Sequence, residues 1–168
     1  MTREELIAVQ APIKQMYKDH PEKAIAELTA ELTIGKDLSC LTKAGNASLQ
    51  IGLHPAVGGS SRYICPAELL LDSVGSCVGI TLSAVATHMG ITIKKGTIRV
   101  IGTVDLRGTL GVSSEAQVGL SRIEVSVDLD TDAAEAEVDK LLQMTEKYAM
   151  VYQTLQTKPE LVVTSAKR

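Results

Sequence analysis

Apolar residues recur every three to four positions at the start of the chain, with polar residues between them. This spacing places them on one face of an α-helix, so we expect a helix over residues 3–18. Thr2 has a suitable side chain to cap its first turn, and Glu5, three residues later, completes a capping box. The apolar stripe consists of Leu6, Val9, Ile13, Met16 and Tyr17.

The next part of the chain has a shorter period. The stretch up to about Leu32 is either helical or extended, and two extended runs follow over residues 38–43 and 48–53. Residues 44–46 between these runs read Ala-Gly-Asn, which is typical of a tight turn, so we expect a β-hairpin. Residues 54–65 are rich in Gly, Ser and Pro without periodicity and predict a loop.

The central run, from Pro66 to Met89, is apolar on nearly every helical face. A helix without a polar face is a buried one, so we expect this helix in the core. Its length approaches that of a membrane span, but it holds too many Ser, Thr and Asp side chains for a lone span, and no membrane contact is expected. Gly75, Gly79 and Ser83 form a smooth ridge that predicts a close helix–helix contact, between subunits as one option.

Two longer extended runs follow at residues 92–106 and 121–128, and a Gly- and Ser-rich loop at residues 108–119 joins them. Apolar and polar residues alternate in the second run, which predicts an antiparallel strand with one exposed face. Its apolar face consists of Ile123, Val125, Val127 and Leu129.

A second long helix is predicted over residues 133–157, with Thr131 or Asp132 as its cap and Pro159 beyond its end. A last short strand is predicted at residues 161–164. The 168 residues contain no repeat or linker, so we expect one domain. The helix residues expected to face the core are Val138, Leu141, Leu142, Thr145, Tyr148, Ala149, Tyr152 and Leu155.

The composition argues against a nucleic-acid partner. The chain has no Phe or Trp and only four Tyr, so it lacks the aromatic platforms on which single-stranded nucleic acids stack. Its formal net charge of −3 gives no basic surface for a phosphate backbone. Because the chain has no Phe or Trp, its core must be aliphatic.

The three cysteines, Cys40, Cys65 and Cys77, are an odd and sparse set that fits a reducing compartment better than a disulfide framework. The first residues show no signal-peptide pattern, so we expect a cytoplasmic protein. The cysteine spacings match no zinc motif, and the three histidines are scattered. Neither a metal nor a cofactor is predicted.

One segment carries a specific motif. Residues 66–78 read P-A-E-L-L-L-D-S-V-G-S-C-V, and Thr81 lies four positions after Cys77. This segment resembles the central-helix motif of the OsmC/Ohr family, in which P-x-E-L-L is followed by small residues, G-[AS]-C and a hydroxyl residue. The resemblance extends more loosely over residues 32–165.

The resemblance implies an α+β, OsmC-like fold with antiparallel sheets packed around two long helices. It also implies an intertwined homodimer. The expected organisation is an N-terminal helical extension at residues 1–31, followed by an OsmC-like domain at residues 32–168.

In this family the cysteine at the position of Cys77 is the peroxidatic thiol, which attacks the O–O bond of organic hydroperoxides and becomes a sulfenic acid. The resemblance thus implies a thiol-dependent peroxidase of oxidative-stress defence. A cation must hold the thiolate charged, and Arg62, in the loop before the helix, is the candidate by proximity. Glu68, the glutamate of the P-x-E-L-L motif, is a further candidate catalytic residue, and its alternative role is to cap the helix start.

The family's second cysteine is missing. Residues 149–155 match its C-P-V-x-x-T-L sequence with Ala149 in place of the cysteine, so an external thiol has to regenerate Cys77. Cys65 is separated from Cys77 by roughly 17 Å of helix, too far for a disulfide within one subunit, although a pairing across subunits stays open.

Two other interpretations of the motif segment remain. A family member without the redox pair would bind a small apolar ligand and catalyse nothing, with Cys77 as a small packing residue. Residues 75–79 also read G-x-C-x-G, like a hydrolase nucleophile elbow. The run before Cys77 is helical and no histidine follows His88, which argues against a hydrolase.

Overall fold

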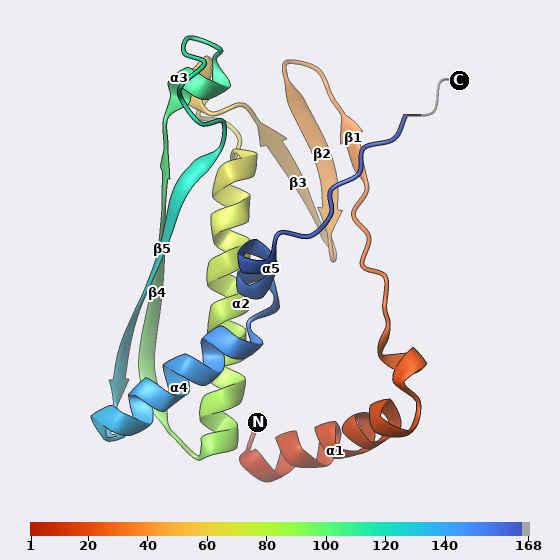
Figure 1. Ribbon diagram of the computed structural model, residues 1–168, viewed down its shortest axis with the longest axis vertical. Coiled ribbons are helices and arrows are strands. Elements are labelled where there is room, and N and C mark those ends of the chain that lie inside the picture. The colour runs from red at the N-terminus through yellow and green to blue at the C-terminus, as the bar shows by residue number, and fades with distance from the viewer. Residues whose placement is uncertain (166–168) are drawn as a thin grey trace.

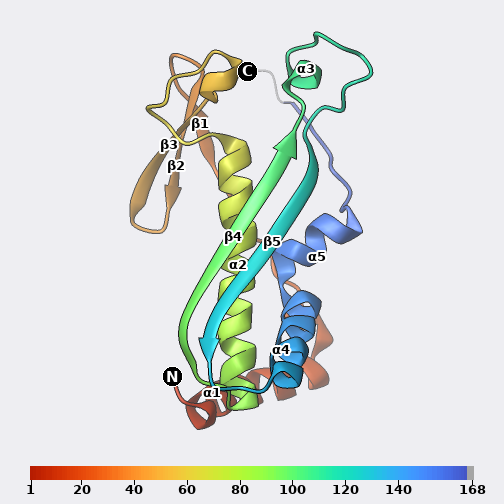
Figure 2. The same cartoon turned by 90° about the vertical axis from the view of Figure 1, so that its left-hand side faces the viewer.

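The computed structural model describes residues 1–165, the side chain of Ala44 excepted; the last three residues of the predicted domain lie outside the described residues. Its centre is one long helix, α2 (Pro66–Met89). A two-stranded ribbon, β4 (Ile93–Val104) and β5 (Leu120–Thr131), lies across α2 (Figures 1 and 2). Two shorter helices, α4 (Glu135–Tyr148) and α5 (Met150–Thr157), pack against α2.

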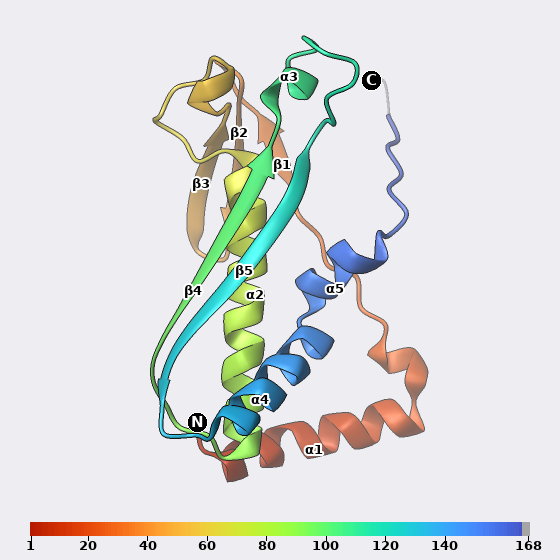
Figure 3. The same cartoon turned by 60° about the vertical axis from the view of Figure 1, so that its left-hand side comes forward.

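A three-stranded sheet and one helix lie at the two ends of α2. A small sheet of β1 (Leu32–Ile34), β2 (Ser39–Ala44) and β3 (Ala47–Gly52) lies near the start of α2, and α1 (Arg3–Asp19) crosses its end (Figure 3). Short helical turns, η1 (Pro21–Ala24), η2 (Pro55–Val57) and α3 (Leu106–Thr109), occupy the connections. The predicted α+β class is confirmed.

The predicted first helix is confirmed together with its capping box. The Thr2 hydroxyl accepts a hydrogen bond from the Glu5 amide at 3.2 Å, and the Thr2 amide donates to the Glu5 carboxylate at 2.8 Å. Arg3 donates from Nε to the carbonyl of His88 at 2.8 Å, which ties α1 to the end of α2. No residue of α1 is buried, so its apolar stripe lies open in the single chain.

The hairpin is confirmed as β2 and β3, with Gly45 in the left-handed region at φ 59° between them. β1 adds a third strand on the other side of β2. The sheet leaves large apolar side chains uncovered, including Ile34 at 87% exposure and Leu41 at 48%. It therefore lacks a partner layer among the residues described.

Helix α2 begins at Pro66 and ends at Gly90, which adopts φ 76° and caps it. The expectation of burial on every face is wrong within one chain. A single stripe is buried, and Ile80 on the opposite side is 73% exposed, because β4, α4 and α5 cover one side only. The buried stripe consists of Val74, Val78, Leu82 and Ala86.

Helix α2 is also long and apolar enough to cross a membrane, with a mean hydropathy of 1.7 over its best window. Core helices of soluble proteins pass the same test. Its buried stripe packs against the aliphatic side chains of β4, β5 and α4, so we interpret α2 as a core helix.

Within the chain, Gly75 and Gly79 of the α2 ridge pack against a strand and not against a helix, and a helix contact between subunits stays a prediction. A Cβ on Gly75 would lie 3.1 Å from Cγ2 of Val100, and a Cβ on Gly79 would lie 3.0 Å from Cδ1 of Ile98. Both neighbours belong to β4. The two glycines thus allow the ribbon to approach the helix axis closely.

The alternation predicted for the second long strand is confirmed in β5, which pairs antiparallel with β4 from Ile93↔Thr131 to Val104↔Leu120. Its apolar residues from Ile123 to Leu129 are half-buried, while the polar residues between them are exposed. This apolar face forms the second wall of the core, opposite α2.

The predicted second long helix is two helices. Ala149 has ψ 101°, an extended value that ends α4 and begins α5. Its side chain is fully buried in the cluster around Val74 and Val78. Packing on α2 therefore stabilises the break, and no local Gly or Pro marks it. As a result α4 and α5 both contact α2.

Three smaller expectations about this region are wrong. The cap of α4 is Ala134, whose amide donates to the Glu137 carboxylate at 3.0 Å, and not Thr131 or Asp132. Tyr148, expected in the core, is 56% exposed, and Leu155 is 39% exposed. Residues 161–165 form no strand, because no neighbouring strand pairs with them.

Candidate active site

Cys77 lies in the middle of α2 and is half-buried. It packs against the buried cluster of Val74, Val78 and Ala149, together with aliphatic residues of β4 and β5. The structure thus places Cys77 and the residue at the missing-cysteine position, Ala149, in one apolar cluster.

The sulfur of Cys77 has a hydrogen-bond donor that the sequence does not indicate. The backbone amide of Val151 points at Cys77 Sγ with a distance of 3.4 Å between nitrogen and sulfur. Val151 is the second residue of α5, so its amide has no acceptor in its own helix. The start of a helix also carries a partial positive charge, and in α5 this end lies next to the Cys77 sulfur.

An arginine was expected next to Cys77 from the sequence, and the structure shows a backbone amide next to its sulfur. Cys77 is too far along α2 to use the dipole of its own helix, but the break at Ala149 points a second helix start at the sulfur. No Gly or Pro marks that break in the sequence, and the pattern of apolar residues continues through it. The match to the family's second-cysteine motif was the only signal that this segment lies near Cys77.

Arg62 lies in the exposed loop before α2. Its guanidinium carbon lies 5.5 Å from the centre of the Tyr63 ring, and its amide donates to the Ser60 hydroxyl at 3.4 Å. These contacts are within its own loop. Among the described residues of one chain, Arg62 makes no contact with Cys77.

Glu68 caps α2. Its carboxylate accepts a hydrogen bond from the Cys65 amide at 2.9 Å, and this bond is the main reason that the pKa of Glu68 lies below its ordinary value. Glu68 lies nine residues before Cys77, about 13 Å along the helix axis. Its observed role is therefore to complete the helix start.

We expect Glu68→Ala to lower the Tm by about 2 °C and to leave the rate at which iodoacetamide alkylates Cys77 unchanged. A carboxylate with a lowered pKa stabilises the folded state at neutral pH, and this contribution is lost as the pH falls through that lowered pKa. The stability difference between wild type and variant should thus disappear in acid. Thermal melts at several pH values measure it, and slower alkylation would contradict a pure capping role.

The other two cysteines are free and lie apart from this site. Cys65 is buried at the cap of α2, and Cys40 is half-buried in β2. No disulfide links the three thiols in the described chain.

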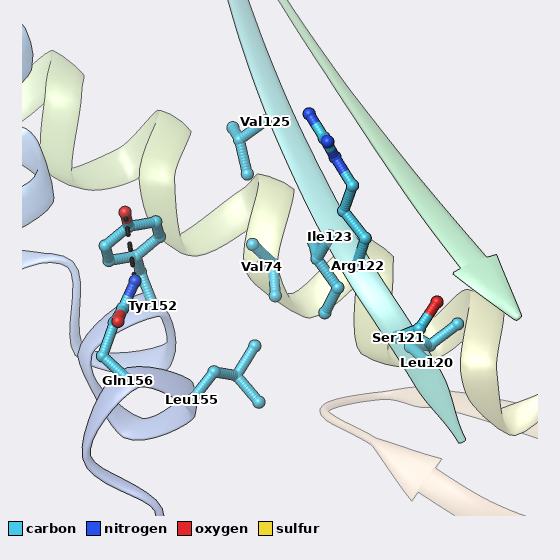
Figure 4. Close-up of a pocket in the computed structure, with 9 residues that line it drawn as sticks. All are labelled: Val74, Leu120, Ser121, Arg122, Ile123, Val125, Tyr152, Leu155 and Gln156. Atoms are coloured by element: carbon cyan, nitrogen blue, oxygen red, sulfur yellow. Dashed lines mark hydrogen bonds between the residues drawn. The ribbon is translucent and has the colours of Figure 1, made fainter. Parts of the chain in front are cut away.

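Two adjacent grooves with aliphatic and polar side chains in their walls run between β5 and the helices α2, α4 and α5. The first has a volume of about 260 Å³ and the second about 230 Å³, and both include Ile123, Val125 and Tyr152 in their walls. In the first, the Tyr152 hydroxyl accepts a hydrogen bond from the Gln156 amide at 3.4 Å (Figure 4).

Cys77 itself lines neither groove, but its packing neighbours Val74, Val78 and Tyr152 do. A ligand in the grooves would lie about one layer of side chains from the sulfur. Arg122 lines the first groove, and its guanidinium pairs with the carboxylate of Glu124 (Figure 4). The site is the Cys77 thiol in an aliphatic cluster, next to the start of α5 and close to two grooves of mixed polarity.

The chain has an α+β fold with a cysteine in the middle of its central helix. The family model described as OsmC-like protein matches residues 58–164. The chain therefore belongs to the OsmC-like family, as the motif around Cys77 predicted.

Solved structures share this fold at low sequence identity. An OsmC-like protein from Mycoplasma pneumoniae matches with a TM-score of 0.67 and 18% identity over 79% of this chain and 89% of that one. An organic hydroperoxide resistance protein from Elizabethkingia anophelis matches with a TM-score of 0.63 and 14% identity, covering 80% and 91% of the two chains. The Bacillus subtilis organic hydroperoxide resistance protein OhrB gives 0.54 and 19%, covering 79% and 94%. No curated protein matches the chain.

Proposed function

We propose that this chain reduces organic hydroperoxides with Cys77 as its single peroxidatic thiol. The observation that carries the proposal is the hydrogen bond from the Val151 amide to Cys77 Sγ inside an apolar cluster. A thiol in an aliphatic cluster suits an apolar peroxide, and two similar structures are organic hydroperoxide resistance proteins.

In the proposed reaction, the Cys77 thiolate attacks one oxygen of the hydroperoxide. The O–O bond breaks, the alkoxide leaves and takes a proton as the alcohol, and Cys77 becomes a sulfenic acid. Because Ala149 stands where the family has a second cysteine, an external thiol reduces the oxidised Cys77 through a mixed disulfide, and a second thiol frees it.

The experiment that tests the proposal is consumption of cumene hydroperoxide by the purified protein with dithiothreitol, compared with Cys77→Ser. Turnover that depends on Cys77 supports it, and no turnover above the thiol alone would overturn it.

We also propose that the working unit is a cytoplasmic homodimer. The open side of α2, the uncovered sheet β1–β3 and the exposed stripe of α1 are together a large apolar surface for a single chain. A second copy that covers these surfaces would give the aliphatic core the partner layers it lacks.

Light scattering should therefore report twice the mass of one chain, which is 17.9 kDa. Ile80→Arg places a charge on the open side of α2 and is expected to shift the protein towards monomer at micromolar concentration. Leu161→Arg is the matched control, because Leu161 is 89% exposed outside any helix or strand. A monomeric wild type would contradict the dimer.

A second function, binding of a small apolar ligand without catalysis, is favoured by one observation. The second groove is lined mainly by aliphatic side chains, and neither groove has Cys77 in its wall. A fluorescent fatty acid that binds wild type and Cys77→Ser equally well, without peroxide turnover, would support this alternative.

A further inference from the structure

We propose that oxidised Cys77 forms a covalent sulfur–nitrogen bond with the backbone amide of Val151. This cyclic sulfenyl amide would replace the disulfide that the missing second cysteine cannot make. The inference rests on the proposed oxidation of Cys77 by a hydroperoxide.

The geometry brings the two atoms together before any reaction. Cys77 Sγ lies 3.4 Å from the Val151 nitrogen, along the direction of the N–H bond. Once the proton leaves, the lone pair of the amide nitrogen points in that same direction, towards the sulfur. A sulfenic acid can condense either with a thiol or with a backbone nitrogen, and Val151 supplies the nitrogen.

The peptide unit between Met150 and Val151 is also polarised at its carbonyl oxygen. The carbonyl of Met150, which is bonded to the Val151 nitrogen, accepts a hydrogen bond from the Thr154 hydroxyl at 2.9 Å. This hydrogen bond withdraws electron density from the amide and eases loss of its proton. Thr154 thus acts as a positioning residue for the condensation.

No protein thiol competes with the amide within the chain. Cys65 lies at the cap of α2, roughly 17 Å from Cys77 by helical rise, and Cys40 lies in the separate sheet. Ala149, in the same cluster as Cys77, has no nucleophilic side chain. The Val151 amide is the nearest described partner of the sulfur.

The step is balanced without a further oxidant. The S–O bond of the sulfenic acid breaks, the S–N bond forms, and the leaving hydroxide takes the amide proton to give water. The hydroperoxide has already supplied the oxidation. An external thiol then attacks the sulfur, breaks the S–N bond, returns a proton to the Val151 nitrogen and leaves a mixed disulfide that a second thiol reduces.

The test treats the Cys40→Ser/Cys65→Ser protein with one equivalent of cumene hydroperoxide, so that Cys77 is the only thiol. The expected product is lighter than the starting protein by about 2 Da, contains a cross-link between the peptides of Cys77 and Val151, survives arsenite and is reversed by dithiothreitol. Arsenite reduces a sulfenic acid, which separates the two species.

Two proline variants of the Cys40→Ser/Cys65→Ser protein form a matched pair. Val151→Pro removes the reacting N–H in the first turn of α5, where no helical hydrogen bond is lost, and should gain about 16 Da and then further oxygen instead of the cross-link. Met150→Pro lies one residue earlier, keeps the Val151 N–H and should still form the cross-link. Thermal melts check that both variants fold.

Thr154→Val should slow formation of the cross-link about fivefold, the effect of one neutral hydrogen bond, without changing the rate at which Cys77 is first oxidised. Cys77 that gains oxygen and never loses about 2 Da would overturn the sulfenyl amide and leave the proposed peroxidase intact. Cys77 that stays unmodified would overturn the proposed function itself. Equal behaviour of the two proline variants would show that the Val151 amide is not the partner.

Discussion

Cys77→Ser is expected to consume cumene hydroperoxide no faster than the buffer with dithiothreitol alone. The loss should be at least about 1,000-fold, because removal of a covalent nucleophile usually costs this much or more. A serine hydroxyl in the same place receives the Val151 hydrogen bond, but it is not ionised at neutral pH and does not attack the O–O bond. Peroxide consumption in a coupled colorimetric assay measures the effect.

Cys65→Ser and Cys40→Ser are the matched controls. Neither thiol contacts the start of α5, so both variants should keep wild-type turnover within about twofold. Serine is also a good cap, so α2 should still begin at its present position in the first control. If either control loses activity while Cys77→Ser keeps it, the assignment of Cys77 is wrong.

Ala149→Cys is expected to restore a two-cysteine enzyme. The introduced thiol lies in the cluster that contains Cys77 and is a far better nucleophile than an amide, so it should capture the sulfenic acid as a disulfide. The variant should then need roughly tenfold more hydroperoxide than wild type for over-oxidation to the sulfinic acid. Peptide mapping without reduction identifies the disulfide.

The matched control is Met150→Cys, because Met150 is the next residue but its side chain is 59% exposed. It should form no disulfide with Cys77 and should over-oxidise as wild type does. The added sulfur of Ala149→Cys enters a fully buried site and should cost about 1 kcal/mol of stability. An Ala149→Cys protein that gains oxygen without a disulfide would show that the two side chains do not face each other.

Much of the fold was predictable because periodicity reports which side of an element is apolar. The extents of α1, α2 and β5 follow from their spacing and caps, and the hairpin follows from residues 44–46. The motif around Cys77 also identified the family correctly. These features are local, and the residues that cause them lie within a few positions of one another.

Other features depend on which element packs against an apolar face, and a local sequence pattern does not indicate that element. Gly75 and Gly79 indicated a close contact, yet only the fold shows that the contact is with β4. Burial of α2 was predicted all round because its pattern has no polar face, but the single chain covers one side. The capping role of Glu68 was one of two alternatives until the Cys65 amide was seen on its carboxylate.

The hydrogen bond on Cys77 separates the two kinds of information most clearly. The sequence by itself determined that a cysteine lies in the middle of an apolar helix, and its resemblance to the family predicted Ala149 at the position of a second cysteine. Only the tertiary structure decided that the chain breaks at Ala149 and turns the Val151 amide towards the sulfur. The break is held by burial of Ala149 against residues more than 70 positions earlier, so neighbouring residues in the sequence carry no signal of it.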